Sequence, residues 1–329
     1  MYGIGIDIGA TNLRVAISDE NGNISIKIAE NTIRTGVGED VTKQIIRMCE
    51  NALNKLNIDL KDIAGIGIGS IGPLDLKNGV IVNPANLPFN QIPLVKPLSQ
   101  HFRKTVFLLN DCTTAVVGEK HFGAGKDVEN LVYITLSTGI GGGAYVDNHL
   151  LIGKDGNAVE IGHIVIDFEE RLTCGCGKKG HWEAYCSGTG IPKLVKMLYR
   201  EKRIDLVLSS IWDEIKGDLN KITSKMIYDH AKKGDEIALE ITDFIGKLNA
   251  IGIASVINVY DPEIITLGGS IALKNPKLVL DPINKYIDKY IINRKPKIIL
   301  TPLGEDVVLY GAIALAFGKE KSVKYIYNS

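Results

Sequence analysis

The sequence predicts an α/β protein built from two related halves. Short strand-like apolar segments alternate with helical segments along the whole chain, which is the pattern of this class. Residues 2–29 and 131–148 share one layout: a strand, a polar turn containing glycine, a second strand and another turn. A length of 329 residues is enough for two domains of ordinary size.

Strands in the first half are indicated by runs rich in Ile, Val and Leu, and turns by Asn and Gly, which tolerate positive φ. The sequence ENGN at 20–23 is typical of a hairpin turn between two such runs. The predicted strands are an apolar run that begins at residue 2 and is broken by the glycine-bearing turn before residue 13, followed by 13–18, 24–29, 63–68 and 106–109. The predicted helices are 40–56 and a segment that begins at 113.

The second half begins with strands and becomes largely helical. Residues 137–143, STGIGGG, are predicted to be one glycine-rich turn between two strands. The predicted strands are 131–136, 144–146, 264–267 and 298–302, and the predicted helices are 191–201, 225–232, 235–260 and 310–317.

Composition excludes several classes of function. Lys+Arg and Asp+Glu are 38 each, so no basic surplus exists to bind a nucleic-acid backbone. The most apolar helical segment, 237–259, is interrupted by Glu240, Asp243 and Lys247, which argues against a membrane span. Five cysteines with a single C-x-C do not form a disulfide framework, and a strand pattern from residue 3 leaves no room for a signal peptide. We expect a cytoplasmic, reduced protein.

Four soft ligands lie close together in a chain otherwise poor in cysteine and histidine. They are His163, Cys174, Cys176 and His181, and glycines are interleaved with them. Two imidazoles and two thiolates complete the tetrahedral shell of a structural zinc site, whereas buried thiols with surface histidines would need no such clustering. Cys49, Cys112 and Cys186 lack such spacing and are predicted to be core residues.

Three glycine-containing turns, each after a predicted strand, are candidate phosphate sites. The first is Asp7 to Asn12, where glycine lets backbone N–H groups approach an anion, Asp7 can hold hydrated Mg²⁺ and Thr11 can donate to phosphate. Each turn alone is also compatible with a simple hairpin. The other two turns contain Thr138, Gly139, Gly268 and Gly269, and none matches a P-loop or a dinucleotide fingerprint.

Asn110 and Asp111 lie where a predicted strand meets a predicted helix. Both residue types favour the N-cap of a helix, which is one interpretation. A carboxylate at the carboxyl end of a strand is also where α/β sheets place their chemistry, and it could accept a proton from an attacking hydroxyl. The sequence leaves both interpretations open.

Taken in order, these motifs resemble the ROK family of repressors and sugar kinases. Its CxCGxxGCxExxxSG signature reads CGCGKKGHWEAYCSG at 174–188, its ExGH motif reads EIGH at 160–163, and its DIGGTK motif reads DIGATN at 7–12. The resemblance runs from residue 3 to about 317. It implies an actin-like, RNase H-like ATPase fold with two domains around a cleft, residues 1–112 plus 310–329 and residues 113–309.

The resemblance also implies a function. Asp111 would be the general base that activates a sugar hydroxyl, most simply the 6-hydroxyl of glucose, for attack on ATP bound with Mg²⁺. The implied sugar-binding residues are Gly72, Pro73, Asn86, Asn110, Asp111, Glu160, His163 and Glu183. The implied nucleotide-binding residues are Asp7, Gly9, Ala10, Thr11, Asn12, Thr138, Gly139, Gly268 and Gly269.

Departures from the family pattern leave some points open. His181 stands where a third zinc cysteine is usual, and Ala10 and Asn12 stand for the usual Gly and Lys. N-acetylmannosamine or N-acetylglucosamine kinase is the alternative within the same framework. A sugar-responsive repressor and a non-catalytic sugar-binding protein are alternatives of other classes, less compatible with the balanced charge and the intact motifs. By resemblance we also expect a homodimer or homotetramer.

Overall fold

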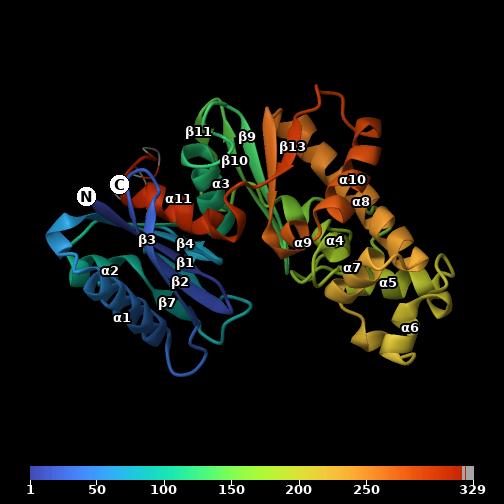
Figure 1. The fold of residues 1–329 in the computed structure, drawn as a ribbon, viewed down its shortest axis with the longest axis horizontal. Helices are drawn as coiled ribbons and strands as arrows, with labels where there is room; N and C mark the ends of the chain where they lie inside the picture. The colour runs from blue at the N-terminus through green and yellow to red at the C-terminus, as the bar shows by residue number, and fades with distance from the viewer. Residues whose placement is uncertain (321–322, 324–329) are drawn as a thin grey trace. The chain divides into compact units, whose positions relative to one another are not determined.

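Two five-stranded sheets with the same strand order form the framework of the protein, whose computed structural model describes residues 1–320 and 323 (Figure 1). The first sheet has the order β3-β2-β1-β4-β8 and the second has the order β11-β10-β9-β12-β13. Each runs third, second, first, fourth and fifth in chain order, so the repeated layout predicted from the sequence is confirmed. The strands of the first sheet are β1 (Tyr2–Ile8), β2 (Asn12–Asp19), β3 (Ile24–Asn31), β4 (Ile63–Ser70) and β8 (Val106–Asn110). Those of the second are β9 (Leu131–Leu136), β10 (Ile140–Val146), β11 (His149–Leu150), β12 (Ile264–Gly268) and β13 (Lys297–Leu300).

Contacts within the chain divide it into two compact units. The first comprises residues 1–133, 143–159 and 301–329, and the second comprises residues 134–142 and 160–300. This division differs from the expected boundary after residue 112, because α3 (Asp111–His121) packs tightly on α11 (Val307–Ala316). A Cβ on Gly311 would lie 1.7 Å from the carbonyl oxygen of Thr114, so only glycine permits this approach.

In the first unit, α11 closes over the sheet formed by N-terminal strands, where Figure 1 shows it in red among the blue elements. A Cβ on Gly67 of β4 would lie 1.9 Å from the carbonyl oxygen of Ala312, so the glycines of the strands let this apolar helix sit directly on the sheet. The amphipathic α1 (Gly38–Leu56) buries Val41, Ile45 and Met48. The unit also holds α2 (Val95–Phe102) and a small sheet of β5 (Leu74–Asp75), β6 (Val80–Val82) and β7 (Gln91–Pro93).

The second unit is largely helical, as predicted. Its long helix α8 (Glu236–Tyr260) packs against α10 (Pro276–Tyr286) and α7 (Ser224–Lys232). Trp182 is fully buried against Gly252 of α8 and donates from Nε1 to Asn249, which makes it a packing residue. The remaining helices are α4 (Glu183–Cys186), α5 (Ile191–Arg200), α6 (Ser210–Ile215) and α9 (Gly269–Lys274).

The glycine-rich turn predicted over 137–143 is shorter than expected. Gly141, Gly142 and Gly143 belong to β10, so their backbone groups serve the sheet and the turn is confined to residues 137–139. The physical reason is packing, since a Cβ on Gly143 would lie 2.5 Å from the carbonyl oxygen of Cys112. The prediction of one turn over 137–143 is therefore wrong for residues 140–143.

Among the described residues, no helix is both long and apolar enough to span a membrane. The buried positions of Cys49, Cys112 and Cys186 confirm them as core residues.

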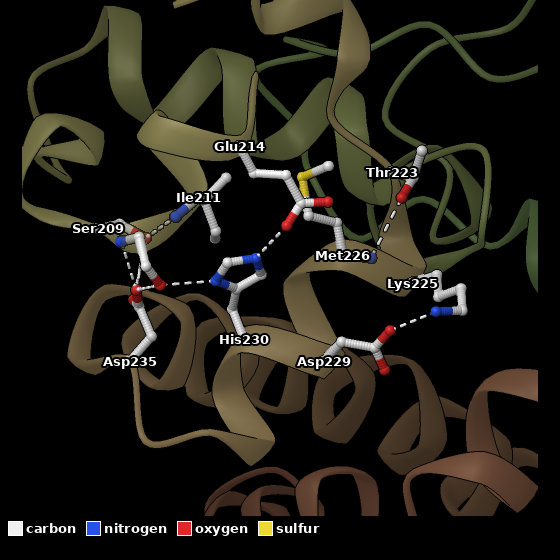
Figure 2. Close-up of polar contacts among 10 residues, drawn as sticks. Ser209, Ile211, Glu214, Thr223, Lys225, Met226, Asp229, His230 and Asp235 are labelled. Carbon is white, nitrogen blue, oxygen red and sulfur yellow. Dashed lines mark hydrogen bonds and ion pairs between the residues drawn. The ribbon is translucent and has the colours of Figure 1, made fainter. Parts of the chain in front are cut away.

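A polar network joins α6, α7 and the start of α8 (Figure 2). His230, 5% exposed, contacts Glu214 through Nε2 at 2.6 Å and Ser210 Oγ through Nδ1 at 2.6 Å. Asp235, the N-cap of α8, accepts from the backbone N–H of Ala238 at 2.9 Å and of Ser210 at 2.7 Å, and also from the Ser209 hydroxyl. One carboxylate therefore holds the start of α8 and the start of α6 together.

Replacing Asp235 by alanine is expected to lower the free energy of unfolding by about 1–3 kcal/mol, because it removes a helix cap and leaves buried donors unpaired. Chemical denaturation of the purified protein measures this. Glu240→Ala, an exposed change on the same helix, is the matched control and should change stability by less than about 0.5 kcal/mol. Equal stabilities of the two variants would contradict the assigned role of Asp235.

Candidate active site

One edge of the first unit's sheet gathers most of its predicted site residues. Strands β1, β4 and β8 are parallel, and the register pairs Ile8 with Ser70 and Ser70 with Asn110. The carboxyl ends of these strands therefore meet at one edge, as is usual for sites in α/β sheets. Residues 9–11 follow β1 and residues 71–73 follow β4, while Asn110 ends β8 and Asp111 comes directly after it.

The loop after β1 is fixed by bonds to its backbone. Gly9 N–H donates to the Asn12 carbonyl at 2.9 Å, and the Thr32 hydroxyl donates to the Gly9 carbonyl at 2.7 Å. Arg34 donates to the Ala10 carbonyl at 3.1 Å, while Thr11 and Asn12 remain exposed. This is a rigid turn with accessible polar groups, as an anion site requires. Sequence reasoning missed Thr32 and Arg34, because only the register of β3 brings them to the loop.

Asp7 is buried at the end of β1 and ion-paired with Arg14 of β2. Arg14 Nε donates to Asp7 Oδ2 at 2.8 Å, and Arg14 Nη2 donates to the same oxygen. Burial raises the pKa of Asp7, and the positive charge and hydrogen bonds of Arg14 oppose that rise.

Asn110 is the N-cap of α3 and Asp111 is its first residue, so the capping interpretation of Asn110 is confirmed. The Cys112 N–H donates to Asn110 Oδ1 at 2.9 Å and to Asp111 Oδ1 at 2.7 Å. A carboxylate in this position is stabilised by the helix dipole in its charged form, the form that a general base needs. Capping and catalysis are therefore compatible here.

The 71–73 loop lies beside Asn110. Ile71 N–H donates to the Ile8 carbonyl at 3.0 Å, and a Cβ on Gly72 would lie 3.8 Å from Asn110 Nδ2. The Gly72–Pro73 peptide bond is cis. Asn86 lies apart from these residues along the chain, exposed in the connection between β6 and β7.

In the second unit, the four predicted metal ligands converge. The ligand atoms of His163, Cys174, Cys176 and His181 all lie within 4.8 Å of one another. Cys176 Sγ is 3.3 Å from His181 Nδ1, and Cys174 Sγ is 3.9 Å from His163 Nδ1. The edges of a zinc tetrahedron with sulfur and nitrogen ligands measure roughly 3.3–3.8 Å, so these two sulfur–nitrogen separations are close to the lengths that the ion requires.

The ionisation of these groups depends on their surroundings. Burial raises the pKa of the Cys174 thiol to about 12. Burial and the neighbouring His163 lower the pKa of His181, which favours its neutral, ligand form.

His163 presents its other nitrogen to Glu160. Its Nδ1 faces Cys174, and its Nε2 is 3.7 Å from Glu160 Oε2. Protein atoms around the carboxylate raise the pKa of Glu160, with His163 opposing and Glu183 adding to the rise, although about half of the Glu160 side chain remains exposed. The arrangement leaves the Nε2 atom of His163 and the Glu160 carboxylate side by side for a polar ligand.

Glu183 connects the segment that carries the four candidate metal ligands, residues 160–183, to the turn after β9. Its Oε2 accepts from the Ile140 N–H at 2.9 Å, and its Oε1 lies 3.3 Å from Cys174 Sγ. A Cβ on Gly162 would lie 2.0 Å from the Ile140 carbonyl oxygen, so the metal segment packs directly on this turn. Glu183 thus has a structural contact that the sequence did not predict.

The turn that contains Thr138 and Gly139 is also held from its other side. Gly188 N–H donates to the Ser137 carbonyl at 2.7 Å, and the Thr189 hydroxyl donates to the Thr138 carbonyl at 3.1 Å. Gly268 and Gly269 mark the junction of β12 with α9.

Gly269 has φ +83°, and a Cβ there would lie 2.5 Å from the Leu136 carbonyl oxygen, so this junction packs against the end of β9. The two glycine turns of the second unit are therefore neighbours, as a joint role in nucleotide binding requires.

Known proteins resemble this chain over nearly all of its length. The ROK family profile matches residues 3–319. A glucokinase of Pyrobaculum calidifontis is 38% identical over 321 residues, which cover 98% of this chain and 97% of that protein. A glucokinase of Thermotoga maritima is 33% identical over 316 residues, with 95% and 96% covered. The crystal structure of a ROK family glucokinase from Streptomyces griseus in complex with glucose and AMPPNP has a TM-score of 0.76 and 30% identity, covering 96% of this chain and 99% of that one. The fold is thus the predicted actin-like ATPase fold, and the chain belongs to the ROK family.

Proposed function

We propose that the protein is an ATP-dependent glucokinase that transfers the γ-phosphate of ATP to the 6-hydroxyl of glucose. The observation that carries this proposal is the sheet edge of the first unit, where Asp111 follows β8 and the turn of residues 9–12, a candidate phosphate site, follows β1. Relatives named glucokinase that align with nearly the whole chain support the same activity.

Asp111 is proposed as the general base. It accepts the proton of the 6-hydroxyl as that oxygen bonds to the γ-phosphorus, while the bond from phosphorus to the bridging oxygen breaks and ADP leaves. Its place at the start of α3, where Oδ1 accepts the Cys112 N–H, holds the carboxylate in one direction. The resulting Asp111 carboxylic acid then loses its proton to solvent.

The binding roles proposed for the other groups are those that the family resemblance implies. We assign the hydroxyls of the sugar to the side chains of Asn86, Asn110, Glu160, His163 and Glu183 and to the backbone of Gly72 and Pro73. We assign the nucleotide to the turns at 9–12, 138–139 and 268–269, with Asp7 holding the hydrated Mg²⁺ of the nucleotide. Magnesium supplies charge neutralisation on the phosphates when it is bound.

A coupled assay of ADP formation over a panel of sugars tests the substrate. We expect glucose to give the highest kcat/KM, ahead of mannose, N-acetylmannosamine and N-acetylglucosamine. A higher kcat/KM for an N-acetyl sugar would contradict the glucokinase proposal and favour an N-acetylmannosamine or N-acetylglucosamine kinase.

We also propose that His163, Cys174, Cys176 and His181 hold one structural zinc ion. The donor set and the spacing of the ligand atoms fit a closed tetrahedral shell, which leaves no position for a reactive water. Zinc on Nδ1 fixes His163 so that its Nε2–H points outward beside Glu160, ready for a sugar hydroxyl.

One zinc per chain is expected by elemental analysis, and His181→Ala should weaken zinc binding by more than roughly 100-fold. Because the thiols lose protons on binding, zinc affinity should rise with pH and fall as the medium becomes acidic. Competition with a colorimetric chelator at several pH values measures both effects. His101→Ala, at an exposed histidine outside the cluster, is the control and should keep full zinc content. Unchanged zinc content in His181→Ala would exclude His181 as a ligand.

A further inference from the structure

Arg14 makes an unusual set of contacts for a strand residue beside a phosphate-type turn. It lies on β2 directly opposite Asp7 of β1 in the sheet register. Its Nε and Nη2 both donate to one oxygen of that carboxylate, Oδ2. Within the described residues, Asp7 Oδ1 receives no hydrogen bond from a side chain, so one oxygen is fixed and the other stays available.

The third nitrogen of Arg14 is also held. Its Nη1 donates to the Glu305 carbonyl at 2.8 Å and to Asp306 Oδ1 at 3.1 Å. Asp306 in turn pairs with Lys27 of β3 at 2.6 Å. Arg14 is thus locked by the segment that leads into α11, and only 22% of its side chain is exposed. A guanidinium held at all three nitrogens has one orientation, which is a property of positioning groups.

A hydrated magnesium ion needs a carboxylate in a defined direction. Without a partner, the Asp7 side chain could rotate and present either oxygen. The water molecules bound to the magnesium ion would then face a carboxylate without a fixed orientation. With Oδ2 occupied, the remaining oxygen points in a single direction. Fixing a group before the substrate arrives lowers the ordering that binding requires.

We propose that Arg14 is a positioning residue of the nucleotide site, which orients Asp7 through Oδ2 so that Oδ1 receives the hydrated magnesium of the nucleotide. This inference rests on the proposed function, because it takes Asp7 as the magnesium-side carboxylate. The Arg14–Asp306–Lys27 chain is the support that keeps the guanidinium in place.

The test compares Arg14→Met, Arg14→Lys and wild type in kinetics at varied Mg²⁺, ATP and glucose. Arg14→Met should raise the KM for ATP and the half-saturating Mg²⁺ concentration by about tenfold or more, the scale of a lost charged hydrogen bond, with the KM for glucose within about twofold. Arg14→Lys should recover part of that loss, because it restores the charge and one donor. Arg47→Met is the matched control, because Arg47 also donates two hydrogen bonds to a carboxylate of the first unit, that of Glu30. This variant should leave all three constants unchanged.

Binding of Mg²⁺–AMPPNP, measured by calorimetry without turnover, gives a second readout. Weaker nucleotide binding in Arg14→Met, partly recovered in Arg14→Lys, would support the positioning role, also where loss of the ion pair with Asp7 lowers the thermal midpoint. Equal losses for ATP and glucose, or a lowered midpoint with unchanged Mg²⁺ dependence, would overturn it. Failure of the proposed function is distinguishable, because wild type itself would then fail to phosphorylate glucose, whereas the Mg²⁺–AMPPNP comparison still reports on Arg14.

Discussion

Asp111→Asn is expected to lower kcat for glucose phosphorylation by roughly 10²–10⁴-fold, the range for loss of a general base. The asparagine oxygen can still accept the Cys112 N–H, so the start of α3 should stay intact. Glucose binding, measured by calorimetry or by quenching of tryptophan fluorescence, should change by less than about tenfold. The loss therefore falls on the chemical step and not on the fold.

Asp40→Asn provides the matched control for this change. Asp40 also lies in the first turn of a helix of the first unit and accepts a backbone N–H, from Val37 at 3.0 Å. Its replacement should leave kcat unchanged. Full activity of Asp111→Asn would remove Asp111 as the base, and a collapse of stability without a specific loss of kcat would make it only a capping residue.

Gly162→Ala is expected to lower kcat/KM for glucose by roughly 100-fold or more, the scale set by a displacement of about 1 Å in a positioned site. The new Cβ would lie 2.0 Å from the Ile140 carbonyl oxygen and 2.9 Å from its carbon, both backbone atoms that cannot swing aside. Either the segment that carries Glu160 and His163 or the turn after β9 must therefore move. Steady-state kinetics with both substrates measure the loss.

Gly175→Ala is the matched control within the same segment. Gly175 stands between the two metal cysteines, but a Cβ there meets nothing within 4 Å and the backbone has no positive φ. This variant should keep wild-type kinetics and zinc content. If both alanine variants behave alike, close packing of Gly162 on Ile140 does not shape the site.

Much of the fold could be predicted because its signals are local. The apolar runs that predict β1, β4 and β9 each lie in a single stretch of sequence, and so does the long helical repeat of apolar residues that predicts α8. The structure confirms these four elements. The repeated layout of the two halves was visible for the same reason. Short elements such as α2 and β5 to β7 were not predicted, because a few residues are too short a stretch to show a repeat of apolar and polar positions.

The glycines of β10 show a different limit. In the sequence, GIGGG is typical of a turn, yet three of these glycines lie in a strand because α3 needs the space above Gly143. Only tertiary packing distinguishes a glycine that frees the backbone from one that makes room for a neighbouring element. The same limit applies to α3, which joins the first unit through contacts with α11 that lie far away in the sequence.

For the candidate site, residue types were more predictable than their partners. The convergence of His163, Cys174, Cys176 and His181 could be predicted from spacing and ligand chemistry. The pairing of Arg14 with Asp7 and the contact of Glu183 with Ile140 could not, because each depends on a strand register or a loop path that no local pattern encodes.

The most direct test of the central proposal is to identify the product formed from ATP, Mg²⁺ and glucose by phosphorus NMR. We predict equimolar glucose 6-phosphate and ADP from the wild-type protein and almost none from Asp111→Asn. No phosphorylated glucose, or a phosphate on a hydroxyl other than that of C6, would contradict the proposal.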